Sequence, residues 1–249
     1  VALDLLDADA VKRVVESVLA LANEPRVAVC SAWPWVDGCE KDPERSFREN
    51  VTTVQNLVAA LPRAVPIFFY STDHVFDGAK GAPYVESDAV NPPSVYARHK
   101  RAVEELLLAR GASLVVRTAW VFGTEVRKKN FVYRVLEAAR AGETLKVPTG
   151  QAGCPTWARW LAESTLTLAD RGMTGVVHLT GSEPFTKAAW ARAIAEELDL
   201  PTLDVREVSA SESGQIAPRP DEVVLASERH ELRQPPARTI IHAEKLGFV

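Results

Sequence analysis

This 249-residue chain has three cysteines, no glycine in its first 37 residues and no long apolar run. No glycine precedes Gly38, which excludes from the N-terminal part a Gly-rich turn that receives a phosphate at a helix N-terminus. No apolar run approaches the ~18 residues that cross a bilayer, and no signal-peptide pattern opens the chain, so we expect no membrane association. The net charge of -4 gives no electrostatic reason to expect a nucleic-acid partner.

Potential metal and disulfide ligands are also few and scattered. The three cysteines, Cys30, Cys39 and Cys154, are odd in number and lack the close pairing of zinc and redox motifs. They predict reduced thiols in a cytoplasmic protein. The five histidines lie too far apart for a local metal motif, so we predict no structural metal.

The chain does contain an alternation of short apolar runs and longer helical patterns, which is typical of a parallel sheet with helices on both faces. The pattern predicts an α/β fold. The predicted strands cover residues 26–31, 66–71, 113–118 and 176–179. The predicted helices cover residues 9–22, 42–61, 93–110, 130–141, a segment that ends near 170, and a segment from the capping Thr186 to 198.

Small or polar residues follow three of the predicted strands. They are Ser31-Ala32-Trp33, Ser71-Thr72-Asp73 and Thr118-Ala119-Trp120. In open α/β sheets, ligands bind beyond the carboxyl ends of the strands, so these segments suit the floor of a cofactor site. The alternative is three ordinary transitions from strand to loop.

The segment Tyr96-Ala97-Arg98-His99-Lys100 places a tyrosine and a lysine on one helix face. The ammonium can then help the phenol to act as a proton donor, and Thr72 is a plausible second hydroxyl. Three such groups suit protonation of a carbonyl oxygen while a nicotinamide delivers hydride. Because this spacing also occurs by chance, the alternative is a half-buried tyrosine beside a solvated lysine.

Taken together, these segments resemble the extended short-chain dehydrogenase/reductases and, within them, the dTDP-4-dehydrorhamnose reductase family. The resemblance covers nearly the whole chain in order. It is carried by residues 31–37 (SAWPWVD), 71–78 (STDHVFDG), 91–100 (NPPSVYARHK), 117–123 (RTAWVFG), 130–131 (NF), 151–156 (QAGCPT) and 219–220 (RP).

The resemblance implies a Rossmann-like, doubly wound parallel sheet in residues 1–123. Residues 124–249 would form mainly a smaller substrate-binding lobe, with segments that return to the first domain. It also implies reduction of the 4-keto group of a nucleotide-linked deoxysugar by NADPH or NADH, with dTDP-4-dehydro-L-rhamnose as the expected substrate and dTDP-L-rhamnose as the product. Tyr96 would donate the proton, Lys100 would bind the nicotinamide ribose and lower the pKa of the phenol, and Thr72 would orient the carbonyl.

Further roles carry over by position, and ordinary packing or surface exposure is the alternative for each. The resemblance implies that the cofactor is contacted by Asp4, Leu5, Ser31, Ala32, Trp33, Asn50, Ser71, Tyr96 and Lys100. It implies that the substrate is contacted by Val36, Thr72, His74, Phe76, Trp120, Asn130, Phe131 and Arg219. The basic run from Arg127 to Lys129 could attract a nucleotide diphosphate or could be a solvated helix start.

The chain departs from the family pattern in its N-terminal part. Residues 1–7 resemble a later strand of the family, so the first strand, first helix and second strand are expected to be missing, most simply because the sequence is truncated. The phosphate-binding loop cannot be assigned, and the choice between NAD and NADP cannot be read. His74 stands where the family often has tyrosine, and Trp33-Pro34-Trp35 is bulkier than usual.

Two other function classes remain open from the sequence. One is a non-catalytic dinucleotide-binding subunit that resembles the β subunit of methionine adenosyltransferase, and the other is a sugar-nucleotide epimerase or dehydratase. The joint presence of Thr72, Tyr96 and Lys100 favours an enzyme, and the order Asp73-His74 lacks the acidic pair of many dehydratases. Some members of the family are dimers, which leaves a homodimer open.

Overall fold

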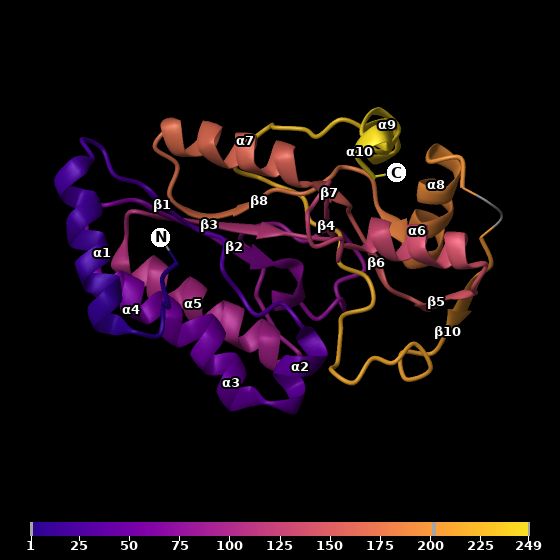
Figure 1. The fold of residues 1–249 in the computed structure, drawn as a ribbon, viewed down its shortest axis with the longest axis horizontal. Helices are drawn as coiled ribbons and strands as arrows, with labels where there is room; N and C mark the ends of the chain where they lie inside the picture. The colour runs from indigo at the N-terminus through magenta and orange to yellow at the C-terminus, as the bar shows by residue number, and fades with distance from the viewer. Residues whose placement is uncertain (1, 201–202, 249) are drawn as a thin grey trace.

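The computed structural model describes residues 2–200 and 203–248, and a parallel four-stranded sheet lies at its centre (Figure 1). The strand order is β1 (Val27–Val29), β2 (Ile67–Thr72), β3 (Ser113–Thr118) and β8 (Gly175–His178). Thr72 lies opposite Thr118 in the register of β2 and β3. The two strands therefore end side by side, at the edge where the sequence predicts a site.

Helices cover both faces of this sheet, as the α/β prediction requires. Helices α1 (Ala8–Leu21), α4 (Thr53–Ala60) and α5 (Val95–Arg110) lie on one face, and α7 (Ala158–Asp170) lies on the other (Figure 1). Ile67 and Phe69 pack in the first core, and Phe68 packs in the second. Both faces of β2 are buried, which explains its continuous apolar run. The prediction of a doubly wound sheet is confirmed.

The region before β2 differs from the prediction of one helix over 42–61. An additional helix, α2 (Val36–Lys41), precedes α3 (Pro43–Phe47), and a π-helical turn, η1 (Arg48–Thr52), joins α3 to α4. The carboxylate of Asp42 accepts a hydrogen bond from Arg45 N at 2.9 Å and caps α3, while Pro43 fits the first turn, where no N–H is needed.

The strand-like interpretation of the first residues is wrong for the part that is described. Asp4 O accepts from Asp7 N at 3.2 Å, so these residues form a turn that leads into α1. Val1 lies outside the described residues. The apolar side chains of Leu3 and Leu5 pack against the first core, which accounts for the apolar pattern without a strand.

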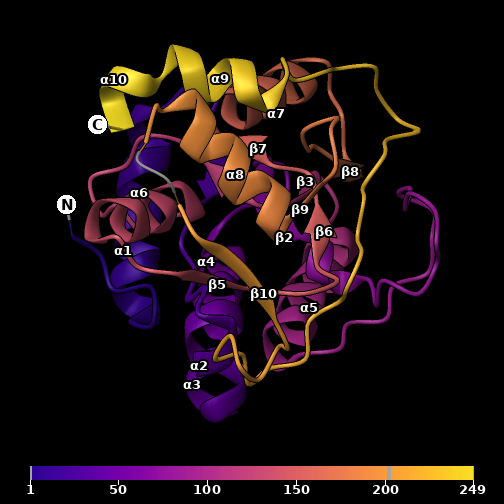
Figure 2. The same ribbon diagram turned by 90° about the vertical axis from the view of Figure 1, so that its right-hand side faces the viewer.

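A third core lies beyond the carboxyl ends of the strands, among the helices that face the viewer in Figure 2. It is built by α6 (Phe131–Ala141), α8 (Lys187–Glu197), α9 (Ala237–Ala243) and α10 (Lys245–Phe248), and β5 (Leu145–Pro148) pairs in parallel with β10 (Val205–Val208) beside it. We propose that these elements are the substrate-binding lobe, and that α7 and β8 are the segments of 124–249 that return to the first domain. None of the helices in the described residues is long and apolar enough to cross a membrane.

Short elements connect the central sheet to this third core. Strand β4 (Val121–Phe122) pairs with β7 (Thr156–Trp157), and β6 (Ala152–Gly153) pairs with β9 (Phe185–Thr186). The 3-10 turn η2 (Asp73–Val75) follows β2 directly. These elements surround the sheet edge at which Thr72 and Thr118 end.

Candidate active site

Helix α5 presents Tyr96 and Lys100 beside the end of β2. Its start is fixed by Ser94, whose hydroxyl accepts from Ala97 N at 3.2 Å. Lys100 Nζ donates to Tyr70 O at 2.8 Å, and it lies 5.9 Å from the centroid of the Tyr96 ring. The lysine is thereby anchored to the backbone of β2 beside the phenol.

The electrostatics of this pair keep the phenol protonated. Burial raises the pKa of Tyr96, and the negative charge of Asp73 raises it further. Burial lowers the pKa of Lys100 to about 8, although the charge of Glu104 acts in the opposite direction. The predicted lowering of the Tyr96 pKa by Lys100 is not found in the chain alone, where burial and the charge of Asp73 raise that pKa. A neutral phenol near pH 7 is the form that can donate a proton.

Polar groups at the ends of β2 and β3 lie at the same edge of the sheet as His74, which contacts the Tyr96 ring. Thr72 Oγ1 donates to Asp73 Oδ1 at 3.1 Å and accepts from His74 N at 3.2 Å. The His74 ring is nearly perpendicular to the Tyr96 ring, with centroids 6.4 Å apart, and burial lowers the His74 pKa. His74 Nδ1 and Thr118 Oγ1 are buried without a hydrogen-bond partner in the described part of the chain. Since buried polar atoms are normally paired, these two atoms point to a ligand.

A buried ion pair between Glu104 of α5 and Arg117 of β3 joins the two elements that carry the site. Arg117 donates to both carboxylate oxygens of Glu104, from Nε at 3.0 Å and from Nη2 at 2.8 Å. Ser71 Oγ donates to Glu104 Oε1 at 2.6 Å. Ser71 is therefore engaged with Glu104, one turn of α5 beyond Lys100.

Trp120 is held in a fixed position above the end of β3. Its backbone is left-handed, with φ of 44°, and Gly153 lies so close that a Cβ there would come within 2.8 Å of the indole Cε2. Lys187 Nζ lies 3.4 Å from the centroid of the Trp120 ring and 4.9 Å from that of Phe131. The ammonium covers the ring that the resemblance implies as a substrate contact.

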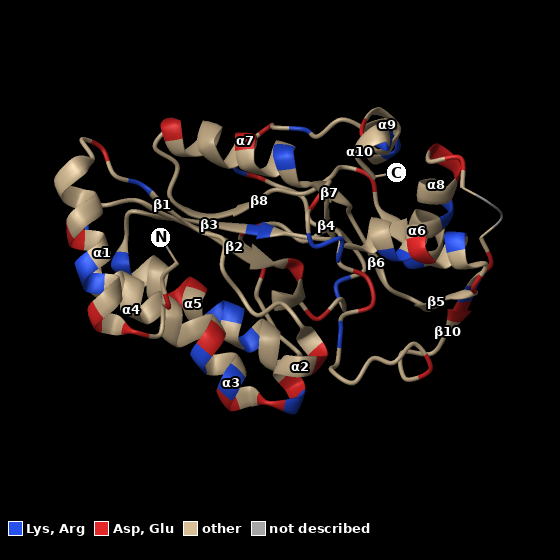
Figure 3. Ribbon diagram, viewed as in Figure 1, with Lys and Arg blue, Asp and Glu red and all other residues tan. Residues whose placement is uncertain are grey.

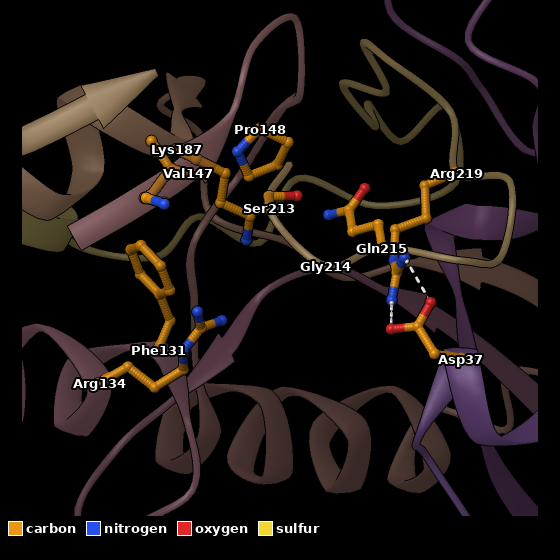
Figure 4. Close-up of a pocket in the computed structure, with 11 residues that line it drawn as sticks. Asp37, Phe131, Arg134, Val147, Pro148, Lys187, Ser213, Gly214, Gln215 and Arg219 are labelled. Atoms are coloured by element: carbon orange, nitrogen blue, oxygen red, sulfur yellow. Dashed lines mark hydrogen bonds and ion pairs between the residues drawn. The ribbon is translucent and has the colours of Figure 1, made fainter. Parts of the chain in front are cut away.

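A pocket of about 150 Å³ opens between the lobe and the C-terminal loop (Figure 4). It is lined by Asp37, Phe131, Arg134, Lys146, Val147, Pro148, Lys187, Ser213, Gly214, Gln215 and Arg219. Arg219 donates to both oxygens of Asp37, from Nη1 at 3.0 Å and from Nη2 at 2.8 Å. Burial alone would raise the pKa of Asp37, but the hydrogen bonds from Arg219 and from two backbone amides lower it to about 2.

Other predicted cofactor residues lie along the N-terminal elements. Asn50 Oδ1 accepts from Trp33 N at 2.8 Å, so Asn50 fixes the loop after β1. Ser31 and Ala32 are exposed in that loop. Asp4 is exposed and accepts from Leu6 N at 2.9 Å in the turn before α1, where Leu5 is partly buried.

The remaining predicted substrate residues divide into pocket and core. Phe131 lines the pocket, and Asn130 caps α6 by accepting from Val132 N at 3.0 Å. Val36 is partly buried at the start of α2. Phe76 is fully buried and stacks on Tyr84, with ring centroids 4.2 Å apart, so its side chain belongs to a small core.

Sequence reasoning missed several residues that the structure brings to this region. The basic run from Arg127 to Lys129 is exposed and does not line the pocket, whereas cations from three other elements do. They are Arg134 on α6, Lys146 on β5 and Lys187 on α8. The predicted cap at Thr186 indicates that Lys187 begins a helix, and this was the one signal in the sequence for its position.

Comparison with known proteins identifies the family. The family model described as the RmlD substrate binding domain matches residues 1–239. The chain belongs to the dTDP-4-dehydrorhamnose reductase family. A dTDP-4-dehydrorhamnose reductase of Mycobacterium tuberculosis (strain CDC 1551 / Oshkosh) is 34% identical over 233 residues, which are 91% of this chain and 74% of that relative. The family resemblance predicted from the sequence is confirmed.

Solved structures agree with this assignment. A dTDP-4-dehydrorhamnose reductase ortholog from Clostridium acetobutylicum aligns with a TM-score of 0.80 at 30% identity, over 90% of this chain and 78% of that chain. The enzyme of the same name from Bacillus anthracis, solved in complex with NADP, aligns with a TM-score of 0.88 over 97% of this chain and 85% of that chain. At 23% identity, this second likeness shows the shared fold.

Proposed function

We propose that this protein reduces the 4-keto group of a dTDP-linked deoxysugar, converting dTDP-4-dehydro-L-rhamnose to dTDP-L-rhamnose with NADPH or NADH. The observation that carries the proposal is a protonated Tyr96 at the carboxyl edge of a doubly wound sheet, with Lys100 anchored beside it. The names of the relatives that match most of the chain support the same reaction.

Tyr96 is the proton donor in this proposal. Its raised pKa keeps the proton on the phenol until a carbonyl oxygen next to it gains negative charge. Thr72 is buried at the end of β2, and its hydroxyl would turn from Asp73 to the same oxygen. Lys100 supplies a positive charge close to the phenol after the proton has left.

The residues at this sheet edge fit the nicotinamide half of the cofactor. A reduced nicotinamide would supply the hydride when bound. Lys100 and the loop of Ser31, Ala32 and Trp33 would hold this half, and the unpartnered hydroxyl of Thr118 offers it a hydrogen bond.

The substrate would extend from Tyr96 toward the cationic pocket. Asp73, which acts electrostatically on both Tyr96 and Lys187, links the reacting end to this pocket. Arg134 and Lys146 line the same pocket farther into the lobe. Such a pocket suits the anionic part of a nucleotide sugar.

A regulatory role and an epimerase role are less well supported. A purely regulatory subunit needs cofactor binding but no protonated acid at the substrate edge, and Tyr96 is held in that form. The solved epimerases that share this fold, such as UDP-glucose 4-epimerase of Thermus thermophilus at 20% identity, show the fold alone.

The proposal is tested by following oxidation of NADPH and NADH with dTDP-4-dehydro-β-L-rhamnose. Tyr96→Phe should reduce turnover at least about tenfold, because it removes the proton donor, and it should leave cofactor binding nearly unchanged. Tyr133→Phe is a matched control, because this buried tyrosine lies in the lobe core. Turnover by Tyr96→Phe above a tenth of the unmodified rate would refute the assignment.

A further inference from the structure

Lys187 is the cation whose placement the fold explains least. It is the first residue of α8, where the helix dipole disfavours a positive charge. Its ammonium lies on the faces of Trp120 and Phe131, and burial lowers its pKa to about 7. Keeping an ammonium in this position is costly unless an anion accompanies it.

Within the described part of the chain, no carboxylate forms an ion pair with Lys187, although the negative charge of Asp73 acts on it and raises its pKa. Of the four cations that line the pocket, Arg219 is the one with a carboxylate partner in the described part of the chain. Arg134 and Arg219 lower the pKa of Lys187 further, whereas the charge of Asp73 raises it. Lys187 therefore shares the pocket with two further cations, Arg134 and Lys146, that form no ion pair within the described residues.

The arrangement around the pocket defines what could balance this charge. Lys187, Phe131 and Arg134 lie on one side, and Arg219 with Asp37 lies on the other (Figure 4). Basic residues of α6 and α8 are visible in this part of the lobe (Figure 3). A ligand between the two sides meets the Lys187 ammonium, and this positive charge favours a phosphate.

We propose that Lys187 is a specificity-determining residue that binds the sugar-linked phosphate of the substrate diphosphate. This inference rests on the proposed function for the identity of the substrate. The charge of Asp73, which also acts on Tyr96 at the reacting end, acts on Lys187, while Arg134 and Lys146 line the same pocket. Lys187 therefore contacts the phosphate next to the hexose, while Trp120 fixes the ammonium from behind.

The test compares thymidine diphosphate and thymidine monophosphate binding to the full chain by calorimetry. In Lys187→Met, the Kd for the diphosphate should rise about tenfold, because one charge-assisted hydrogen bond is lost. The Kd for the monophosphate should change by less than about twofold, because that ligand lacks the second phosphate. Lys187→Arg should stay within about threefold of the unmodified protein for both ligands. Lys12→Met, an exposed lysine on α1, is the matched control.

Equal losses for both nucleotides, or no loss for either, would overturn the inference. Retained monophosphate binding also shows that Lys187→Met is folded. In steady-state assays with the keto sugar, Lys187→Met should raise KM about tenfold and leave kcat within about threefold. If the unmodified protein reduces no dTDP-keto sugar but the diphosphate effect is found, the proposed reaction fails and the role of Lys187 stands. If the unmodified protein reduces the keto sugar but Lys187→Met binds the diphosphate normally, the proposed reaction stands and the role of Lys187 is refuted.

Discussion

The buried pair of Glu104 and Arg117 gives a stability prediction that can be worked from the structure. Glu104 is 0% exposed and Arg117 is 2% exposed, and the two share two hydrogen bonds. Glu104→Gln removes the carboxylate charge and leaves the guanidinium buried without a counter-ion. Breaking a buried pair in this way costs about 3 to 5 kcal/mol. We expect the free energy of unfolding to fall by about 3 kcal/mol, because glutamine keeps part of the hydrogen bonding.

Urea unfolding followed by circular dichroism measures this difference. Glu105→Gln is a matched control on the next residue of α5, because Glu105 is exposed and its pair with Arg101 is worth less than about 1 kcal/mol. The double variant Glu104→Leu with Arg117→Met should recover much of the loss, since neither charge of the pair then remains buried. A Glu104→Gln protein within about 1 kcal/mol of the unmodified one would refute the reasoning.

Three further predictions concern the walls of the site. The Asp37 pair with Arg219 should contribute about 2 kcal/mol to the free energy of unfolding above about pH 4, because the Asp37 pKa of about 2 in the folded protein lies below the usual 3.8. This contribution should disappear as the pH falls from about 4 to 2. The free energy of unfolding of Asp37→Asn should lack this dependence on pH. Gly153→Ala should displace Trp120 and cost about 1 to 3 kcal/mol, and an unchanged KM and unfolding midpoint would contradict the close packing. Ser94→Ala should lose about 1 kcal/mol in urea unfolding through the cap of α5, and a value near zero would show that the cap is dispensable.

The sheet and the main helices were predictable because their signals are local. Strand β3 matches the predicted 113–118, and α5 begins two residues inside the predicted 93–110, after its cap Ser94. Thr186 caps α8 as predicted, by accepting from Ala189 N at 3.1 Å. Apolar periodicity and capping residues act within a few positions along the chain, so a single sequence contains them.

The pairing of the lobe could not be predicted in the same way. Strand β5 pairs with β10, which lies more than fifty residues away, and neither short strand has a pattern of its own. The π-helical turn η1 interrupts what reads as a continuous helix. Such features depend on tertiary packing, which overrides weak local preferences.

Tertiary packing also gives Arg219 and Lys187 contacts that their positions in the sequence do not suggest. Arg219 resembles a substrate ligand by position, but Asp37 neutralises it across 182 positions of the chain. Lys187 resembles a solvated lysine in a first helical turn, but the fold places it on Trp120. The positive charge available to an anion therefore lies on the lobe side of the pocket, whereas the Arg219 side forms a pre-paired wall. This charge distribution draws an anionic substrate toward Lys187. We therefore expect that this single side chain distinguishes a ligand with two phosphates from a ligand with one.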